Sequence, residues 1–196
     1  GKELFDLAFL NEGSALATVG APGGAVPNGV RAMSAVQGAV GVWDFLQPHH
    51  QALVASMSFP GDERGARSVL FSPRYQSLYV GAKSGDLCVF DLRMMKLRKQ
   101  AVRAHEGNIR TMALHPTERI LVTGSSDGGI KIWNVPEMKV AHDWKNVHSR
   151  HIFVGSSNGI FSHPVSTLSV MNVKFASHNE LYTCGADGHV HRVELS

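Results

Sequence analysis

The sequence predicts an all-β protein made of four copies of one antiparallel strand unit. Each copy has a β-rich run, a glycine, a short polar turn and an alternating run that ends in a bulky residue. Three copies are continuous: SLYVGAKSGDLCVFDL (77–92), ILVTGSSDGGIKIWNV (120–135) and LYTCGADGHVHRVEL (181–195). The runs are short and rich in Val, Ile, Leu, Phe and Tyr, as is typical of strands. No stretch keeps a 3.6-residue apolar period over ten residues, so helices are not expected.

A fourth copy is interrupted, and further strand-like runs flank all four. It begins as ALATVG (15–20) and resumes as AVGVWDFL (39–46). We take Gly81, Gly124 and Gly185 as the same position in the three continuous copies. The flanking runs before the glycine strands are 4–11, 66–73, 109–116 and 170–177, and those between units are 51–59, 96–102 and 139–145. The sequence therefore predicts four units with approximate ranges 1–59, 66–102, 105–145 and 148–196.

Two longer segments interrupt the pattern. Residues 21–40 are rich in Ala, Gly and Val, and residues 146–168 contain the polar stretch GSSNG. Both are expected to be disordered or surface excursions rather than domains, and GSSNG suggests a mobile loop.

Composition is that of a soluble globular protein, with 43% hydrophobic and 18% charged residues. The net charge of +3 is too small to indicate nucleic-acid binding. Cys88 and Cys184 lie far apart in apolar runs, which predicts buried free thiols in a reducing compartment. There is no apolar run of about eighteen residues and no charged-then-apolar leader, so no transmembrane segment is expected. Because the chain lacks an initiator Met, Gly1 is expected to be a fragment boundary.

The spacing Gly124-x-Ser126-x-Gly128 matches the nucleophile elbow of serine hydrolases. Such an elbow needs a helix directly after the turn. Here the alternating run that ends at Trp133 predicts a strand, and Asp127-Gly128 indicates a type I′ hairpin turn. A second G-x-S-x-G, at 155–159, lies in the later insertion without strand–turn–helix context. We expect a structural turn and no enzyme activity.

The stretch AHEGNIRTMALHPTERILVTGSSDGGIKIWNV resembles a complete WD40 repeat, the blade of a β-propeller. The resemblance implies a buried hydrogen-bonded set, and a carboxylate that orients an imidazole would hold a loop against a hairpin. By spacing, the set is His105, Thr123, Asp127 and Trp133. Its histidine, hydroxyl and aspartate also allow a catalytic-triad interpretation, but the turn and the tryptophan favour a scaffold role.

The other copies depart from this pattern. Trp43-Asp44 matches the Trp-Asp signature of the family, and Phe90-Asp91 nearly does. Ser84 replaces the aspartate in the second copy and Val193 replaces the tryptophan in the last. Thr183 and Asp187 are retained there. These copies are expected to depend more on apolar packing between blades.

Propellers have four to eight blades, and seven are familiar in the WD40 family. The chain starts on an inner strand and ends on a third strand. The predicted fold is therefore a WD40-repeat β-propeller in which 1–196 supplies the four C-terminal blades of a larger, seven-bladed ring.

A narrower resemblance is to the C-terminal propeller of the DMX-like proteins, or rabconnectin alpha subunits. It rests on FDLAFLNEGSALATVG, GVWDFLQP, VHSRHIF, the repeats above and the ending CGADGHVHRV, and departs at 21–40 and 154–168. The resemblance implies a large cytosolic, non-enzymatic scaffold that promotes assembly of the vacuolar-type proton pump with a second WD-repeat subunit. It also implies recruitment to the cytosolic face of acidic endomembranes through protein partners, without cofactors.

A run of basic residues and two pairs of histidines each have competing interpretations. Arg93, Lys96, Arg98, Lys99 and Arg103 form a basic run, but it lacks the aromatic residues that stack on nucleic acid. We expect these charges to discourage edge pairing instead. The pairs His49-His50 and His189/His191 lack a third ligand of fixed spacing, so no metal site is predicted.

The stretch Phe90-Asp91-Leu92-Arg93 supports an alternative function. It resembles the Trp-Asp-x-Arg box by which some WD40 proteins dock the adaptor of a cullin ubiquitin ligase. The alternative is therefore a substrate receptor of such a ligase.

Overall fold

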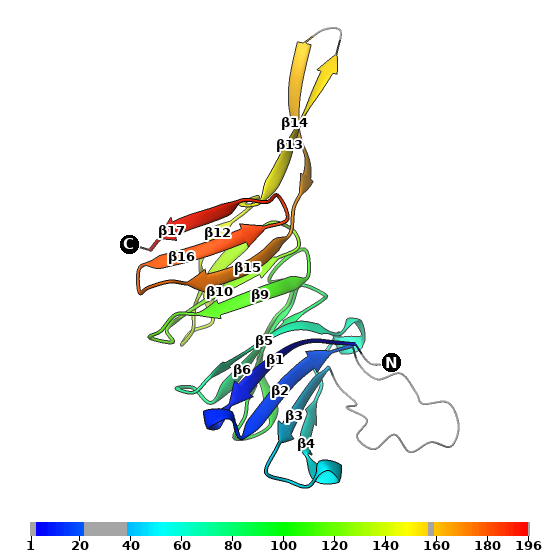
Figure 1. The fold of residues 1–196 in the computed structure, drawn as a ribbon, viewed down its shortest axis with the longest axis vertical. Coiled ribbons are helices and arrows are strands. Elements are labelled where there is room, and N and C mark those ends of the chain that lie inside the picture. The colour runs from blue at the N-terminus through cyan, green and yellow to red at the C-terminus, as the bar shows by residue number, and fades with distance from the viewer. Residues whose placement is uncertain (1–2, 22–38, 157–158, 196) are drawn as a thin grey trace, which may run out of the picture. The chain divides into compact units, whose positions relative to one another are not determined.

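The computed structural model describes residues 3–21, 39–156 and 159–195. Only the backbone is described for residues 12, 49, 62, 149–156 and 159–167. The described residues form seventeen strands and three short 3-10 helices, at Asn11–Gly13, His49–Gln51 and Asp62–Arg64 (Figure 1). The all-β prediction is confirmed. No helix in the described ranges is long and apolar enough to span a membrane. Most of the insertion predicted at 21–40, and Gly1, lie outside the described residues.

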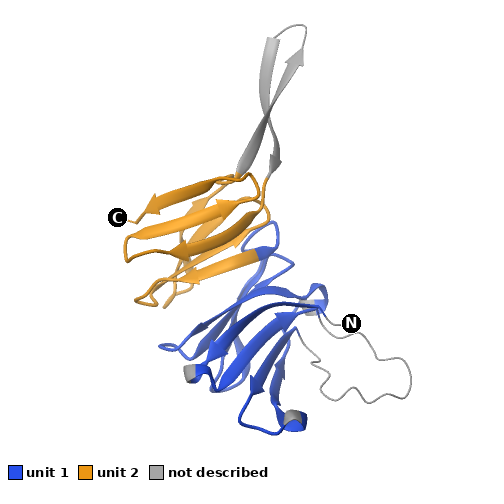
Figure 2. Cartoon of the chain, in the orientation of Figure 1, with its two compact units in different colours: residues 1–109 blue, residues 110–196 orange. Residues whose placement is uncertain are grey.

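Fifteen of the seventeen strands form four antiparallel sheets in which neighbours in sequence are neighbours in space, and the other two form a separate two-stranded sheet. The first sheet is β1 (Leu4–Leu10), β2 (Ala15–Gly20), β3 (Val40–Asp44) and β4 (Leu53–Met57), and the second is β5 (Ala66–Ser72), β6 (Ser77–Ala82), β7 (Leu87–Asp91) and β8 (Lys96–Ala101). The third is β9 (Ile109–Leu114), β10 (Ile120–Ser125), β11 (Ile130–Asn134) and β12 (Lys139–Trp144), and the fourth is β15 (Val170–Phe175), β16 (Glu180–Gly185) and β17 (Val190–Glu194). The chain divides into two compact units, residues 1–109 and 110–196 (Figure 2).

In the first unit, the faces of two sheets pack on each other. Strands β1 and β2 contact β5, and the Asp6 carboxylate accepts a hydrogen bond of 2.9 Å from the backbone N–H of Val69. Strand β6 is buried along its whole length because both of its faces are covered. Apolar side chains such as Val19, Leu78 and Phe90 form one continuous core across both sheets.

In the second unit, the sheet of β15–β17 packs on β10, and Val122, Ile132 and Leu181 belong to its core. The buried His115 ring links the two sheets at one end. Its Nε2 lies 2.7 Å from the carbonyl oxygen of His178, which only accepts hydrogen bonds, so Nε2 carries the proton. Its Nδ1 then accepts from the Thr117 hydroxyl at 2.7 Å.

The insertion expected at 146–168 has a regular backbone on both sides of GSSNG, whose residues 157 and 158 lie outside the described part of the chain. The backbone forms an antiparallel hairpin of β13 (Ser149–Ser156) and β14 (Gly159–Thr167), paired from Ser149↔Thr167 to Ser156↔Gly159 (Figure 1). Composition did not predict these strands because ladder hydrogen bonds involve backbone groups, which nearly every residue type supplies. The second G-x-S-x-G has its central Ser157 outside the described residues.

The turn at Asp127-Gly128 joins β10 to β11, but it is not the predicted type I′ turn. Gly128 has a φ of +78°, whereas Asp127 is not in the left-handed region. The backbone N–H of Gly128 donates to the Ser125 carbonyl, and that of Ser125 donates to Gly129. The result is a three-residue loop with glycine at its left-handed position, in which only one residue needs positive φ. The strand predicted after this turn is confirmed.

Gly185 does not occupy the position of Gly81 and Gly124, contrary to the sequence alignment. Gly81 pairs with Leu87, Gly124 with Ile130, and Cys184 with Val190. Gly185 is thus one residue later, and a side chain there would collide with the ring of His148. The glycine of the last copy serves this close approach and not the strand register.

The turn glycines of different sheets are predicted to differ in tolerance to alanine. Gly85 and Gly188 have φ of +88° and +79°, so alanine is strained at both. A Cβ at Gly85 would also collide with the carbonyl oxygen of His105, whereas nothing lies within 4 Å of one at Gly188. We expect Gly188→Ala to lower the free energy of unfolding by about 1 kcal/mol, and Gly85→Ala by clearly more. Urea denaturation measures both, and equal losses would contradict the predicted collision.

Candidate functional site

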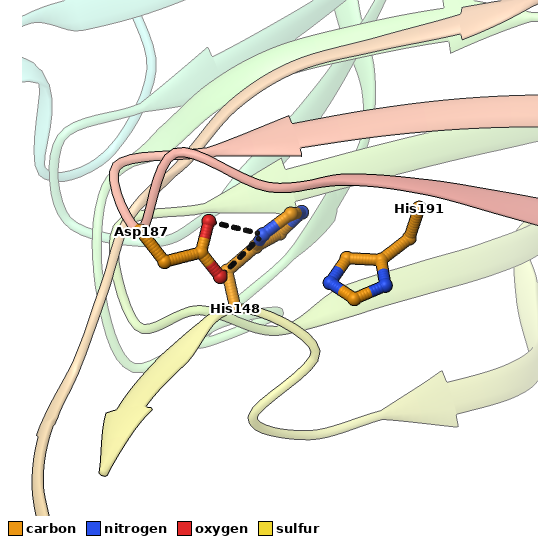
Figure 3. A group of neighbouring side chains, drawn as sticks. All are labelled: His148, Asp187 and His191. Atoms are coloured by element: carbon orange, nitrogen blue, oxygen red, sulfur yellow. Dashed lines mark hydrogen bonds and ion pairs between the residues drawn. The ribbon is translucent and has the colours of Figure 1, made fainter.

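The most complete polar network of the second unit surrounds His148. This residue follows β12 and directly precedes β13, while Thr183 lies on β16 and Asp187 in the turn between β16 and β17. The ring of His148 faces the Asp187 carboxylate (Figure 3). The Nδ1 atom of His148 lies 3.0 Å from both carboxylate oxygens of Asp187, and its Nε2 lies 3.1 Å from the Thr183 hydroxyl. The histidine side chain is fully buried and that of Asp187 is 6% exposed. Both ring nitrogens are therefore engaged.

The backbone holds His148 in place on two sides. Its N–H donates to the carbonyl of Gly128, and its own carbonyl accepts from the N–H of Leu168 at 3.0 Å. The β13–β14 hairpin thus leaves and rejoins the fold at the histidine without displacing it. His105 has a similar place in the first unit, because its N–H donates to the carbonyl of Gly85, in the equivalent turn, at 3.0 Å.

The Asp187 carboxylate is held in its charged form. Burial acts to raise its pKa, but the backbone N–H of His189 and the ring of His148 lower it by more. The net result is a pKa below the ordinary value of 3.8. Opposite charge and hydrogen bonds to the ionised form thus outweigh desolvation here.

The four residues expected to form a buried set are divided between the two units. Thr123 and Trp133 are brought together in the second unit: the indole N–H donates to the threonine hydroxyl at 3.0 Å. In the turn, the Asp127 carboxylate accepts from the N–H of Gly129 at 2.8 Å. His105 is buried in the first unit. The complete set of four remains a prediction.

Sequence reasoning missed His148 because the inserted hairpin separates it from the inner strand of its sheet. In the third copy, His105 comes shortly before the inner strand, and this short spacing is what identified it as the histidine of the hydrogen-bonded set. The only local signal for His148 was its placement after β12, like that of His105 after β8.

A second missed residue is Asp86, at the turn between β6 and β7. Sequence reasoning identified Ser84 as replacing an aspartate, but the carboxylate lies two residues later. Asp86 accepts from the Ser84 hydroxyl at 3.0 Å, from Gln100 Nε2 at 3.1 Å and from the Arg103 backbone N–H at 2.6 Å. It therefore ties the β6–β7 turn to the end of β8. The order Ser-Gly-Asp in place of Asp-Gly was the available signal.

The remaining candidate residues lie apart from these networks. Ser126 lies in the hairpin turn that precedes β11, so the helix that an elbow serine requires is replaced by a strand. Cys88 is a buried free thiol as predicted, while the free Cys184 is only half-buried. Of the basic run, Arg93, Lys96, Arg98, Lys99 and Arg103, all five are exposed and three lie on β8, an outer strand of its sheet. His50 is exposed in a 3-10 turn, and the side chain of His49 lies outside the described residues.

A groove opens at the loop end of the first unit. It has a volume of about 240 Å³, and its lining includes Leu10, Val42, Trp43, Leu46, Val54 and Met95. Leu46 is 80% exposed and Val54 is 54% exposed. Exposed apolar side chains gathered at a groove are typical of surfaces that bind other proteins.

Comparison with known proteins assigns the repeat. A family model described as WD domain, G-beta repeat matches residues 96–134. The chain is a WD40-repeat domain. Domains of this type mediate protein–protein interactions, and the WD40 resemblance inferred from sequence is confirmed.

Curated relatives extend the similarity to most of the chain. DmX-like protein 1 of Mus musculus is 30% identical over 184 residues, and the human protein of the same name is 29% identical. Each match covers 93% of this chain and 5% of the relative. The predicted relationship to the DMX-like family is thereby confirmed for a segment that spans about a twentieth of those proteins.

Solved structures share the fold at low sequence identity. Raptor of Chaetomium thermophilum superposes with a TM-score of 0.72 at 16% identity, covering all of this chain and 16% of that one. Sqt1 of the same organism, solved with the N-terminus of the ribosomal protein L10, gives a TM-score of 0.67 at 21% identity, covering 97% and 43%. These likenesses show the fold alone.

The Trp133–Thr123 hydrogen bond yields a stability prediction. In Thr123→Val, the buried indole N–H loses its acceptor, so we expect the free energy of unfolding to fall by about 1–3 kcal/mol. Thr123→Ser retains the hydroxyl and should lose less. Urea denaturation measures both, and a valine variant as stable as the serine variant would refute a stabilising role for this bond.

The low pKa of Asp187 predicts how stability depends on acid. Its carboxylate stabilises the folded chain above the unfolded pKa of about 4, and this stabilisation is lost as the pH falls through the lower, folded pKa. In Asp187→Asn, the free energy of unfolding should therefore fall less steeply between about pH 5 and pH 2 than in the wild type. Thermal melts across this range test it, with the exposed Glu63→Gln as control. Identical pH profiles for wild type and Asp187→Asn would rule the effect out.

Proposed function

We propose that this chain is a non-enzymatic protein-binding segment of a large cytosolic scaffold that regulates assembly of the vacuolar-type proton-translocating ATPase. The observation that carries the proposal is the similarity to DmX-like protein 1 over 93% of the chain. The DMX-like resemblance implies pump subunits and a second WD-repeat rabconnectin subunit as partners. It also implies recruitment to the cytosolic face of acidic endomembrane compartments through those partners.

The chemistry of the buried networks supports a scaffold. A histidine, a hydroxyl and a carboxylate meet at His148. However, Thr183 is only 1% exposed, and its hydroxyl faces the imidazole of His148. A nucleophile must reach its substrate, and this hydroxyl is enclosed between sheet and loop. Ser126, the other hydroxyl with a catalytic spacing, lies in a turn followed by a strand. Both arrangements suit holding a fold together.

We place the partner contact at the apolar groove of the first unit. Leu46 lies between β3 and β4 and Met95 between β7 and β8, and Trp43 also lines the groove. Large apolar side chains that stand in water in the free protein gain free energy when a partner covers them. An apolar segment of a pump subunit or of the companion WD-repeat subunit fits such a groove.

The alternative function, a substrate receptor of a cullin ubiquitin ligase, has less support. In its candidate box, Phe90 is fully buried in the core. The Asp91 carboxylate accepts hydrogen bonds from the backbone N–H groups of Arg93 and Met94, so it caps its own turn. Of the four residues of the box, only Arg93 is exposed. The box therefore serves mainly to end strand β7.

Capture of defined partners tests the function and the groove separately. The immobilised protein should retain purified soluble-sector pump subunits or the second WD-repeat subunit, and should not retain the ligase adaptor. Leu46→Asp is expected to weaken this capture at least tenfold, because it places a charge where an apolar contact forms. Val102→Asp, at an exposed apolar residue of the same unit that does not line the groove, is the matched control.

Each outcome has a distinct meaning. Retention of the adaptor alone would replace the proposed function by its alternative, and retention of neither would overturn it. Capture that is equally strong with Leu46→Asp would leave the function in place and refute the groove as its surface.

A further inference from the structure

We propose that His148, Asp187 and His191, with His189 as a fourth ligand, form a binding site for a divalent transition metal such as Zn²⁺. One possible ligand atom from each of the first three residues lies within 4.8 Å of the others. In Figure 3, the ring of His148 lies between the Asp187 carboxylate and the ring of His191. The centroids of these two rings are 4.9 Å apart.

His189 extends the cluster on the exposed side. Its Nδ1 lies 3.8 Å from a carboxylate oxygen of Asp187, and its ring stacks on that of His191 at 6.4 Å between centroids. His189 directly precedes β17 and His191 lies on it, and the stacking places both imidazoles on one side of the chain. His189, His191 and the turn aspartate thus lie close together beside the ring of His148.

The possible ligand atoms of His148, Asp187 and His191 lie within 4.8 Å of one another, a looser spacing than that of a loaded site. Zinc–nitrogen and zinc–oxygen bonds of about 2.0–2.1 Å in a tetrahedron place ligand atoms about 3.4 Å apart. The separation between Asp187 and His189 exceeds this by only a few tenths of an ångström. His189 and His191 are exposed, so rotation of their side chains closes the remaining distance without moving the backbone.

The buried half of the site supplies a rigid anchor. At present the proton between His148 Nδ1 and the Asp187 carboxylate satisfies both groups. A divalent cation in place of that proton would bind nitrogen and oxygen together, and Nε2 would then donate to the Thr183 hydroxyl. Metal-binding histidines usually have their second ring nitrogen hydrogen-bonded in this way, which fixes the ring orientation.

The donor set selects the class of ion. Imidazole nitrogens with a single carboxylate suit Zn²⁺, Ni²⁺ or Cu²⁺, whereas Ca²⁺ and Mg²⁺ prefer sites built from oxygen. Sequence spacing did not reveal this site because His148 lies 39 residues before Asp187. A bound ion would tie the β16–β17 hairpin to the base of the β13–β14 hairpin.

Zinc titration of the purified, metal-free protein tests the proposal. By isothermal titration calorimetry we expect one ion per chain, and by thermal unfolding a rise in Tm with Zn²⁺. His191→Gln and His189→Gln change exposed side chains outside the His148–Thr183 bond, so both variants should fold. Each should weaken binding at least tenfold. His142→Gln, at an exposed histidine of β12 outside the cluster, is the matched control and should bind as the wild type does.

Co²⁺ replaces Zn²⁺ in a second measurement that is independent of stability. A single four-coordinate Co²⁺ spectrum that is lost in His191→Gln supports the site. The proposal is overturned if binding is not stoichiometric, if Co²⁺ stays six-coordinate, or if His142→Gln weakens binding as much as the two cluster variants do. The last result would indicate adventitious chelation by scattered surface histidines only.

Discussion

Every buried polar atom in a small sheet needs a hydrogen-bond partner. The four sheets meet this requirement in different ways at one equivalent position, which is Thr18, Val80, Thr123 or Thr183 on the second strand of each sheet. Among the described residues, no buried side-chain nitrogen or oxygen lacks a hydrogen-bond partner. In the first sheet, Trp43 donates to Thr18 at 2.9 Å, as Trp133 does to Thr123 in the third. Leaving such a group unpaired costs more than the bond itself is worth.

The other two sheets keep the same balance by different means. In the second, Val80 and Phe90 occupy the corresponding positions, so the hydroxyl and the indole N–H are both absent and the pair packs in the apolar core. In the fourth, Val193 replaces the tryptophan while Thr183 remains, and the threonine hydroxyl bonds to His148 instead. Copies that look degraded in sequence are therefore complete in hydrogen bonding. Each sheet either keeps both polar groups, loses both, or finds a third residue.

The hairpin inserted after His148 illustrates how a repeat tolerates added sequence. The insertion begins and ends at one point, where the His148 carbonyl accepts from Leu168, so the histidine keeps its place against Asp187. Because both ends of the added segment lie together, the entropic cost of ordering it arises within the segment, and the sheet is not distorted. Two exposed histidines, His189 before β17 and His191 on it, lie beside this buried one.

The sequence by itself determined the strands of the four repeated units, most of their turns and the repeat. These depend on local chemistry: alternation of apolar residues, glycine at positions of positive φ, and the tryptophan at the end of a strand. It also predicted the non-helical context of Ser126 and the Trp133–Thr123 neighbourhood, since both lie within one hairpin.

Tertiary structure alone decided the rest. The type of the Asp127-Gly128 turn, the shift of Gly185 and the hairpin at 149–167 depend on backbone hydrogen bonds and close approach, which residue types specify weakly. The meeting of His148 with Asp187, and of Asp86 with Gln100, joins residues whose separation along the chain is set by loops and not by a period. Local spacing carries no information about such pairs, because the folded sheets bring them together.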